Sequence, residues 1–130
     1  MKTKTLHQTI HFNAPPKKVY ELIMDAKNHS AFTGSDVRMS KAIGGKFEAF
    51  DGYIHGHNIE LQEGMFIQQA WHFKEDGWTD DHFSICTFRF RPDKGGTELK
   101  FTQQNIPLPS FEALKKGWHT FYWRPMKQML

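Results

Sequence analysis

The sequence predicts an α+β fold: a curved, seven-stranded antiparallel sheet wrapped on a long C-terminal helix, with two short helices after strand one. Three observations lead to this prediction. Apolar residues alternate with polar ones near the N-terminus, strand-like segments then follow one another between turn residues, and the C-terminal segment repeats apolar side chains at helical spacing. A sheet with one apolar face must bury that face, and only the C-terminal helix is long enough to cover it. The helix is therefore expected to lie across the sheet.

The N-terminal third of the chain predicts one strand and two helices. Alternation over residues 6–12 indicates a half-buried strand, in which Gln8 is the one polar residue on the apolar face. Pro16 suits the first turn of a helix, which is expected to run to about residue 26. A second short helix is expected over residues 28–33, and Gly34 would end it.

The middle of the chain predicts six further strands joined by short turns. They are expected near residues 37–42, 46–55, 57–62, 65–74, 82–91 and 97–105. Short connections imply antiparallel hairpins, and Gly56 is interpreted as the break between the second and third of these strands. Two sets of residues are expected on the covered face: Cys86, Phe88 and Phe90, and Leu99, Phe101 and Gln103.

The C-terminal residues 110–130 predict one long amphipathic helix. Ser110 is the expected N-cap. Gly117 lies on or beside the apolar stripe, where it would permit a close approach to the sheet. Pro125 cannot donate a hydrogen bond to the carbonyl group of Phe121, so a kink is expected there.

Length and composition restrict the class of protein. The 130 residues fit one domain, residues 1–130, and 38% hydrophobic with 24% charged residues is typical of a soluble globular protein. A single cysteine, Cys86, excludes an internal disulfide, and no signal-peptide pattern is visible, so a cytoplasmic location is expected. The net charge of +3 is small and unevenly spread, so nucleic-acid binding is not predicted. No apolar run is long enough for membrane insertion.

Four segments, in order along the chain, resemble a known family. They are residues 51–61 (DGYIHGHNIEL), 67–71 (IQQAW), 96–107 (GTELKFTQQNIP) and 117–127 (GWHTFYWRPMK). Together they resemble the C-terminal domain of activators of the heat-shock protein 90 ATPase, a family within the START-like (SRPBCC), helix-grip superfamily. The resemblance implies the helix-grip fold. It does not by itself choose a function, because the superfamily holds lipid carriers, polyketide cyclases and co-chaperone domains.

The leading hypothesis is that a small, largely apolar molecule binds between the sheet and the C-terminal helix. Aromatic residues form 15% of the chain, and they can fill a core, line a pocket, or both. The expected cavity residues are Phe47, Gln69, Trp71, Phe88, Phe101, Gln103, Trp118 and Tyr122. Gln69 and Gln103 would orient the ligand as polar anchors, with hydrogen bonds to backbone or water as the alternative. His119 is a further candidate on the flank of the helix.

Two other functions stay open. A chaperone or other protein could bind the outer surface near the basic N-terminal strand, as the family resemblance implies, or the chain could be a cyclase- or hydrolase-type enzyme. No catalytic residue, metal or cofactor is predicted. His55 and His57 are interpreted as exposed turn histidines, residues 80–82 (DDH) as a hydrophilic loop, and Cys86 as an inert buried thiol. The sequence leaves the oligomeric state open.

Overall fold

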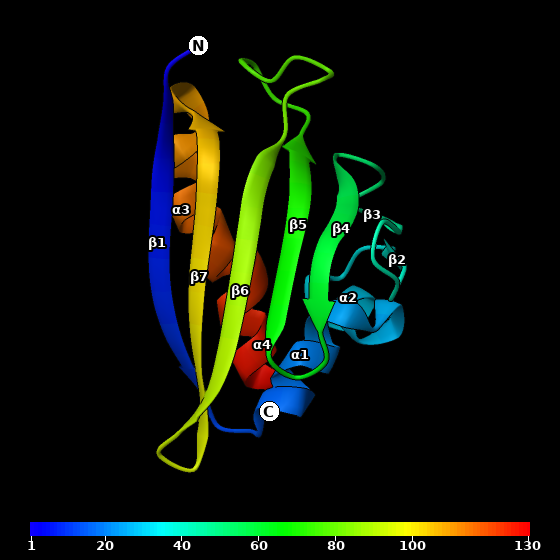
Figure 1. The fold of residues 1–130 in the computed structure, drawn as a ribbon, viewed down its shortest axis with the longest axis vertical. Coiled ribbons are helices and arrows are strands. Elements are labelled where there is room, and N and C mark those ends of the chain that lie inside the picture. Colours follow the sequence, from blue (N-terminus) through cyan, green and yellow to red (C-terminus); the bar gives the residue numbers. More distant parts are fainter.

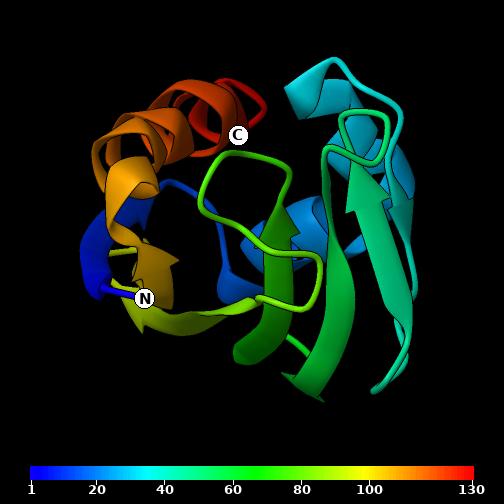
Figure 2. The same ribbon diagram turned by 90° about the horizontal axis from the view of Figure 1, so that it is seen from above.

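A curved antiparallel sheet forms the frame of the molecule, and all helices pack on its concave side (Figures 1 and 2). The structure is a computed structural model that describes residues 1–130. As predicted, the sheet has seven strands and every neighbouring pair is antiparallel. The strand order is β1-β7-β6-β5-β4-β3-β2. The strands are β1 (Thr3–Phe12), β2 (Arg38–Met39), β3 (Lys46–Ala49), β4 (Ile54–Gln62), β5 (Phe66–Phe73), β6 (Ser84–Asp93) and β7 (Gly96–Pro107).

The turn between β3 and β4 lies at residues 50–53, so the prediction of a break at Gly56 is wrong. Gly56 lies inside β4, between β3 and β5. A Cβ atom there would lie 1.8 Å from the carbonyl oxygen of Ala70 and 2.9 Å from the ring of Phe47. This glycine therefore permits a close approach within the sheet. A glycine in a strand pattern can mark such a close approach instead of a break.

Two short helices, α1 (Pro16–Met24) and α2 (Ala26–Thr33), follow β1 as predicted. Asp25 separates them, and its Oδ1 accepts hydrogen bonds from the backbone N–H groups of Lys27 (2.9 Å) and Asn28 (3.2 Å). This carboxylate caps the N-terminus of α2, which therefore begins earlier than expected. Gly34 ends α2 in the left-handed conformation, with φ of 73°, as predicted.

The C-terminal helix is continuous but changes its winding. Its parts are a 3-10 turn, η1 (Leu108–Ser110), then α3 (Phe111–Trp118), η2 (His119–Trp123) and α4 (Arg124–Gln128). Segment η2 is π-helical, and the N–H of Arg124 donates to the carbonyl oxygen of His119. A wider turn just before Pro125 is one way for a helix to accommodate a residue that has no N–H. The predicted irregularity at the proline is therefore a π-helical segment.

Ser110 does not cap the helix, contrary to prediction. No side-chain hydrogen bond caps α3, and the Ser110 hydroxyl instead accepts a hydrogen bond of 2.9 Å from the indole N–H of Trp78. Both groups are buried, so this tertiary bond satisfies two polar atoms that would otherwise lose their contact with water. It also ties the loop between β5 and β6 to the start of the C-terminal helix.

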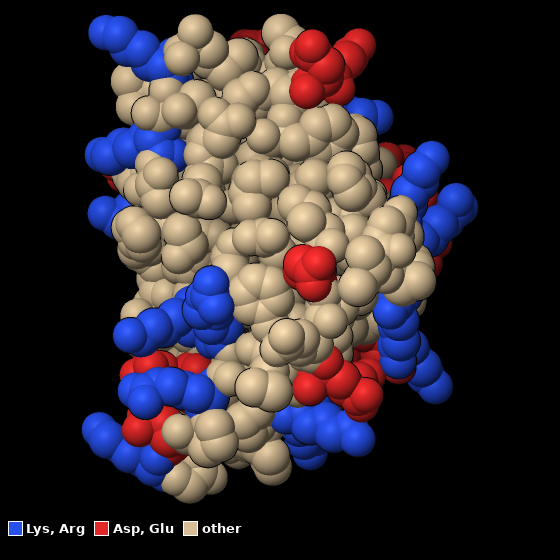
Figure 3. Space-filling model, viewed as in Figure 1, with Lys and Arg blue, Asp and Glu red and all other residues tan.

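Aromatic side chains fill the concave side over β6 and β7. The indole rings of Trp118 and Trp123 stack at 5.4 Å, and both pack on Phe101, at 4.5 and 5.2 Å between ring centroids. The residues predicted on the covered faces of β6 and β7 are all buried. The opposite, convex face carries charged side chains mainly at its margins (Figure 3). No helix is long and apolar enough to cross a membrane.

Candidate ligand pocket

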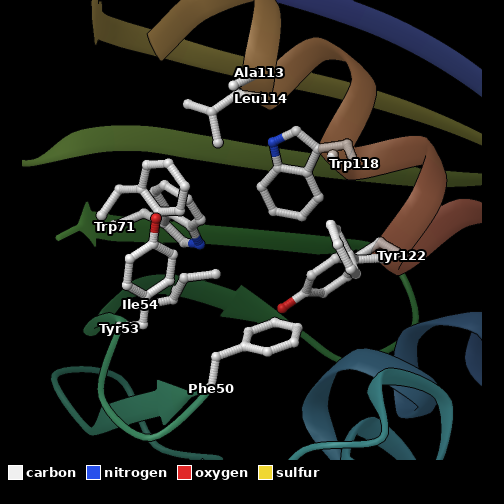
Figure 4. Close-up of a pocket in the computed structure, with 11 residues that line it drawn as sticks. Phe50, Tyr53, Ile54, Trp71, Ala113, Leu114, Trp118 and Tyr122 are labelled. Carbon is white, nitrogen blue, oxygen red and sulfur yellow. The ribbon is translucent and has the colours of Figure 1, made fainter. Parts of the chain in front are cut away.

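An apolar pocket of about 640 Å³ lies between the C-terminal helix and the part of the sheet near the β3–β4 turn (Figure 4). Ten of its 11 lining residues are hydrophobic. They are Phe50, Tyr53, Ile54, Trp71, Phe73, Ala113, Leu114, Gly117, Trp118, Phe121 and Tyr122. The pocket therefore occupies the part of the concave side that the stacked tryptophans do not fill.

The β3–β4 turn brings an aromatic ring to the mouth of the pocket. Phe50, Asp51 and Gly52 all adopt the left-handed conformation, with φ of 53°, 58° and 80°. This conformation is strained for a bulky residue such as Phe50. The turn is held by a hydrogen bond of 3.0 Å from the N–H of Phe50 to Ser35 Oγ. The ring of Phe50 then meets that of Phe121 edge to face, with 5.9 Å between their centroids.

Gly117 leaves room in the helix wall of the pocket. The nearest atom to a Cβ placed on Gly117 would be Phe121 Cδ2, at 3.9 Å. No atom of the sheet comes as close, so the predicted close approach of helix to sheet is wrong at this residue. The missing side chain instead enlarges the pocket.

Tyr122 is fixed in the pocket wall by His29, which the sequence analysis did not identify. His29 Nδ1 lies 2.9 Å from the carbonyl oxygen of Ile23, and His29 Nε2 lies 2.8 Å from the Tyr122 hydroxyl. A carbonyl can only accept, so Nδ1 carries the proton and Tyr122 donates to Nε2. Burial lowers the pKa of His29 to about 4 and raises the pKa of Tyr122. Both groups are therefore neutral near pH 7.

Tyr53 lies at the rim and links two loops. Its hydroxyl donates to Glu75 Oε2, which belongs to the loop between β5 and β6. Burial, together with this carboxylate, raises the pKa of Tyr53 to about 12. The ring of Tyr53 also packs edge to face on Phe73, at 4.8 Å between centroids. Tyr53 therefore keeps its proton and stays in place beside the opening.

Residues 13–130 match the family described as "Activator of Hsp90 ATPase homolog 1-like protein". The chain belongs to this family. It is 34% identical over 117 residues to the activator of 90 kDa heat shock protein ATPase homolog of Dictyostelium discoideum, covering 89% of this chain and 30% of that protein. It is 27% identical over 128 residues to homolog 2 of Mus musculus, covering 98% of this chain and 38% of that protein. The chain thus spans less than half of these relatives.

Solved structures show the same fold. The crystal structure of PFC0360w, described as an HSP90 activator from Plasmodium falciparum, superposes with a TM-score of 0.89 at 25% identity, covering 96% of this chain and 94% of that one. Protein MLL2253 from Mesorhizobium loti has the same fold, with a TM-score of 0.83 at 17% identity, covering 96% and 95%. The helix-grip fold and the family resemblance are confirmed.

Three of the eight predicted cavity residues line the pocket of this family member, namely Trp71, Trp118 and Tyr122. The other five do not line it. Phe88 and Phe101 are buried and pack against each other and against Trp118. Phe47 fills the space beside Gly56 on the neighbouring strand. Their predicted contact with a ligand is therefore not supported by position.

The two predicted polar anchors are held by other side chains. Gln69 Nε2 donates to Asn58 Oδ1 at 3.0 Å. Gln103 Nε2 donates to Ser84 Oγ at 3.0 Å, and Gln103 Oε1 accepts from the indole of Trp118 at 2.8 Å. These partners are side chains, whereas the alternative to a ligand was a hydrogen bond to backbone or water. The ligand-binding role of all eight residues stays a prediction, and the geometry places three of them around one pocket.

The remaining candidates lie away from the pocket. His55 and His57 lie on strand β4 rather than in a turn, and both rings pack near Phe83, at 5.9 and 6.1 Å between centroids. No group of three or more His, Cys, Asp or Glu side chains is placed to hold a metal ion. Burial raises the pKa of the Cys86 thiol well above its ordinary value. His119 is exposed and does not line the pocket.

The DDH segment belongs to the loop between β5 and β6, as predicted. Asp81 accepts a hydrogen bond of 2.7 Å from the hydroxyl of Thr79, which lowers the pKa of its carboxyl group. His82 Nε2 lies 2.9 Å from the carbonyl oxygen of Asn105, so it carries a proton and donates. Asp81 therefore bonds within the loop, and His82 bonds to β7.

Proposed function

We propose that this protein binds a small, largely apolar molecule in the pocket between the C-terminal helix and strands β4 and β5. The observation that carries the proposal is the pocket itself, about 640 Å³ in volume and lined by ten hydrophobic residues out of 11. Small-molecule sites in proteins have volumes of roughly 300–1,000 Å³ and mostly apolar walls. The pocket has the size and the chemistry of such a site.

Removal of apolar surface from water would drive binding. Phe121 is 52% exposed at the mouth, and Phe50 is partly buried opposite it. Trp71 and Trp118 offer two large ring surfaces deeper in the pocket, 5.7 Å apart between centroids. A ligand that covers these rings gains the hydrophobic effect and ring packing together.

The lining favours binding over catalysis. It holds no carboxylate, imidazole, thiol or ammonium group. General acid–base and nucleophilic catalysis use these groups or a tyrosine hydroxyl. The two tyrosine hydroxyls of the lining already donate, that of Tyr53 to Glu75 and that of Tyr122 to His29. The proposed role is therefore that of a carrier or sensor of an apolar molecule.

A pocket-filling variant tests the proposal. Gly117→Leu adds a side chain at the pocket wall from a position where a Cβ atom meets nothing closer than 3.9 Å, and leucine suits a helix. A ligand at a hundredfold excess over its Kd stabilises a protein by about 2.7 kcal/mol, which raises the Tm of a domain of this size by several degrees. In a thermal-shift screen of neutral aromatic compounds, we expect selective rises for the wild-type protein and for Gly117→Ala, and none for Gly117→Leu. Equal rises for Gly117→Leu would contradict the proposed site.

A second function, binding to an Hsp90 chaperone, is favoured by the names of the two curated relatives. Its test is capture of purified Hsp90 by this protein, with the chaperone's ATPase rate as a second readout. If the basic N-terminal region forms the contact, the exposed residues Lys2 and Lys18 are suitable sites for charge reversal. We then expect Lys2→Glu with Lys18→Glu to weaken capture, and Gly117→Leu to leave it unchanged. Failure of the wild-type protein to capture Hsp90 would count against this function.

A further inference from the structure

The pocket contains one hydrogen-bond donor that the protein does not use. Among the lining side chains, only Tyr53, Trp71, Trp118 and Tyr122 carry an N–H or O–H group. Three of these donors have partners within the protein: Tyr53 donates to Glu75, Trp118 to Gln103, and Tyr122 to His29. The indole N–H of Trp71 makes no hydrogen bond, although the indoles of the other three tryptophans all do.

The unused donor opens on the pocket. Trp71 as a residue is only 3% exposed. Every side-chain nitrogen or oxygen atom that is sealed from solvent has a hydrogen-bond partner, and Trp71 Nε1 has none. This Nε1 atom is therefore open to solvent, and Trp71 lines the pocket. In Figure 4 this nitrogen lies on the edge of the ring that faces Tyr122 across the pocket. A ligand that covered this donor without accepting its hydrogen bond would leave it buried and unpaired, which is costly, so a ligand with an acceptor at this place is favoured.

The surroundings of Trp71 define the rest of the ligand. Phe73 stacks on Trp71 at 5.4 Å, and Trp118 lies tilted at 5.7 Å. These rings touch one another, and the ring surfaces that they turn to the pocket favour a flat molecule packed against them. No Lys, Arg or His side chain lines the pocket, so a bound carboxylate would lose its hydration without gaining a counter-charge.

Building on the proposed function, we infer that the ligand is an uncharged, flat ring compound whose oxygen, of the carbonyl type, accepts a hydrogen bond from Trp71 Nε1. This assigns Trp71 as the residue that orients the ligand, the role predicted for the two glutamines. The ligand class is thus a neutral aromatic ketone or a molecule of the same acceptor chemistry, rather than a fatty acid.

Three naphthalene probes test this assignment by calorimetry. Acetylnaphthalene carries the acceptor, isopropenylnaphthalene replaces its oxygen with a methylene group, and naphthoate carries a negative charge. The measured quantity is the ratio of the Kd values of acetylnaphthalene and isopropenylnaphthalene. This ratio is compared between protein variants, because the two probes differ in hydrophobicity by the same amount for every variant. In Trp71→Phe, which keeps a ring but removes the donor, we expect the preference for the ketone to fall by about fivefold relative to wild type.

The control variant is Trp78→Phe, which makes the same exchange of ring at a residue that does not line the pocket and whose N–H already donates to Ser110. It should leave the ratio unchanged. Naphthoate should bind the wild-type protein at least about tenfold more weakly than the ketone, because its charge has no partner. An unchanged ratio in Trp71→Phe, or tighter binding of naphthoate, overturns the inference while leaving the pocket as a binding site. If no probe binds the wild-type protein, the proposed function fails, and the inference fails with it.

A measurement on the wild-type protein covers the case in which Trp71→Phe does not fold. The four tryptophans give four indole N–H signals in a proton–nitrogen NMR spectrum. Three of these protons are hydrogen-bonded within the protein, and that of Trp71 is not. Acetylnaphthalene should move the Trp71 signal downfield, as a new hydrogen bond does, and isopropenylnaphthalene should not. A shift confined to other indole signals overturns the inference.

Discussion

At the scale of single residues, the pocket depends on a buried histidine. His29 lies between the carbonyl group of Ile23 and the hydroxyl of Tyr122, and its ring stacks on Phe32 at 5.0 Å. Because the ring is removed from water, its charged form is disfavoured, and the neutral form accepts the proton of Tyr122. His29 thereby holds one wall of the pocket in a single orientation.

This arrangement predicts a loss of stability at acid pH. The folded protein has a His29 pKa of about 4, below the ordinary value of 6.5, so between these two values the unfolded chain binds a proton that the folded chain does not. The contribution of His29 to the free energy of unfolding is full above pH 6.5 and falls by about 3 kcal/mol as the pH drops to 4. Urea unfolding between pH 7.5 and 4 measures it.

Two variants test this prediction, one at His29 and a control at a second histidine, His119. His29→Gln removes the titrating group, so its stability should vary less with pH over this window than that of the wild-type protein. The exposed His119→Gln should retain the full dependence. If His29→Gln shows the same slope as the wild-type protein, another group is responsible.

At the scale of secondary-structure elements, one side chain joins the first strand to the last helix. Gln8 Nε2 donates to the carbonyl oxygen of Lys115 at 3.0 Å, and Gln8 Oε1 accepts from the indole N–H of Trp123 at 2.7 Å. The alternation of β1 identifies Gln8 as the one polar residue on its apolar face. A polar residue at such a position needs partners, and the helix supplies both.

Gln8→Leu should therefore destabilise the protein by about 1–3 kcal/mol, because it leaves the buried indole N–H of Trp123 without an acceptor. Urea unfolding at pH 7 measures the change. Gln104→Leu on β7 is the matched control, since this glutamine is exposed and makes no side-chain hydrogen bond. We expect it to change the free energy of unfolding by less than about 0.5 kcal/mol. Equal stability of the two variants would mean that the link between strand and helix is not needed.

Periodicity and turn residues were enough to predict the number and order of the elements along the chain. They failed where a residue type can have either of two structural roles. Gly56 ends no strand, because it allows the carbonyl group of Ala70 and the ring of Phe47 to approach closely inside the sheet. Ser110 does not cap its helix, because a buried indole competes for its hydroxyl. Both outcomes depend on residues distant in sequence, which a local pattern does not contain. The π-helical segment is similar, since Pro125 signals an irregularity without defining its form.

At the scale of the whole molecule, the curved sheet offers one concave side that is filled over β6 and β7 and left open over β4 and β5. The order of the elements predicts the concave side, and the aromatic content predicts rings within it. Which rings fill it depends on rotamers and on the depth of the helix, so Phe88 and Phe101 were predicted as cavity residues but are packed core. Phe50 and Phe121 were missed, because one lies in a turn and the other on the exposed side of a helix.

This division between a filled and an open half predicts opposite effects for two phenylalanines. Phe101 is 1% exposed, so Phe101→Ala should lower the free energy of unfolding by about 3–5 kcal/mol. Phe121 is 52% exposed, so Phe121→Ala should change it by less than about 1 kcal/mol while weakening the binding of acetylnaphthalene severalfold. Urea unfolding and calorimetry on both variants measure the two quantities. If Phe121→Ala loses as much stability as Phe101→Ala and binds the probe unchanged, the rings at the mouth belong to the core, and the open half is not a site.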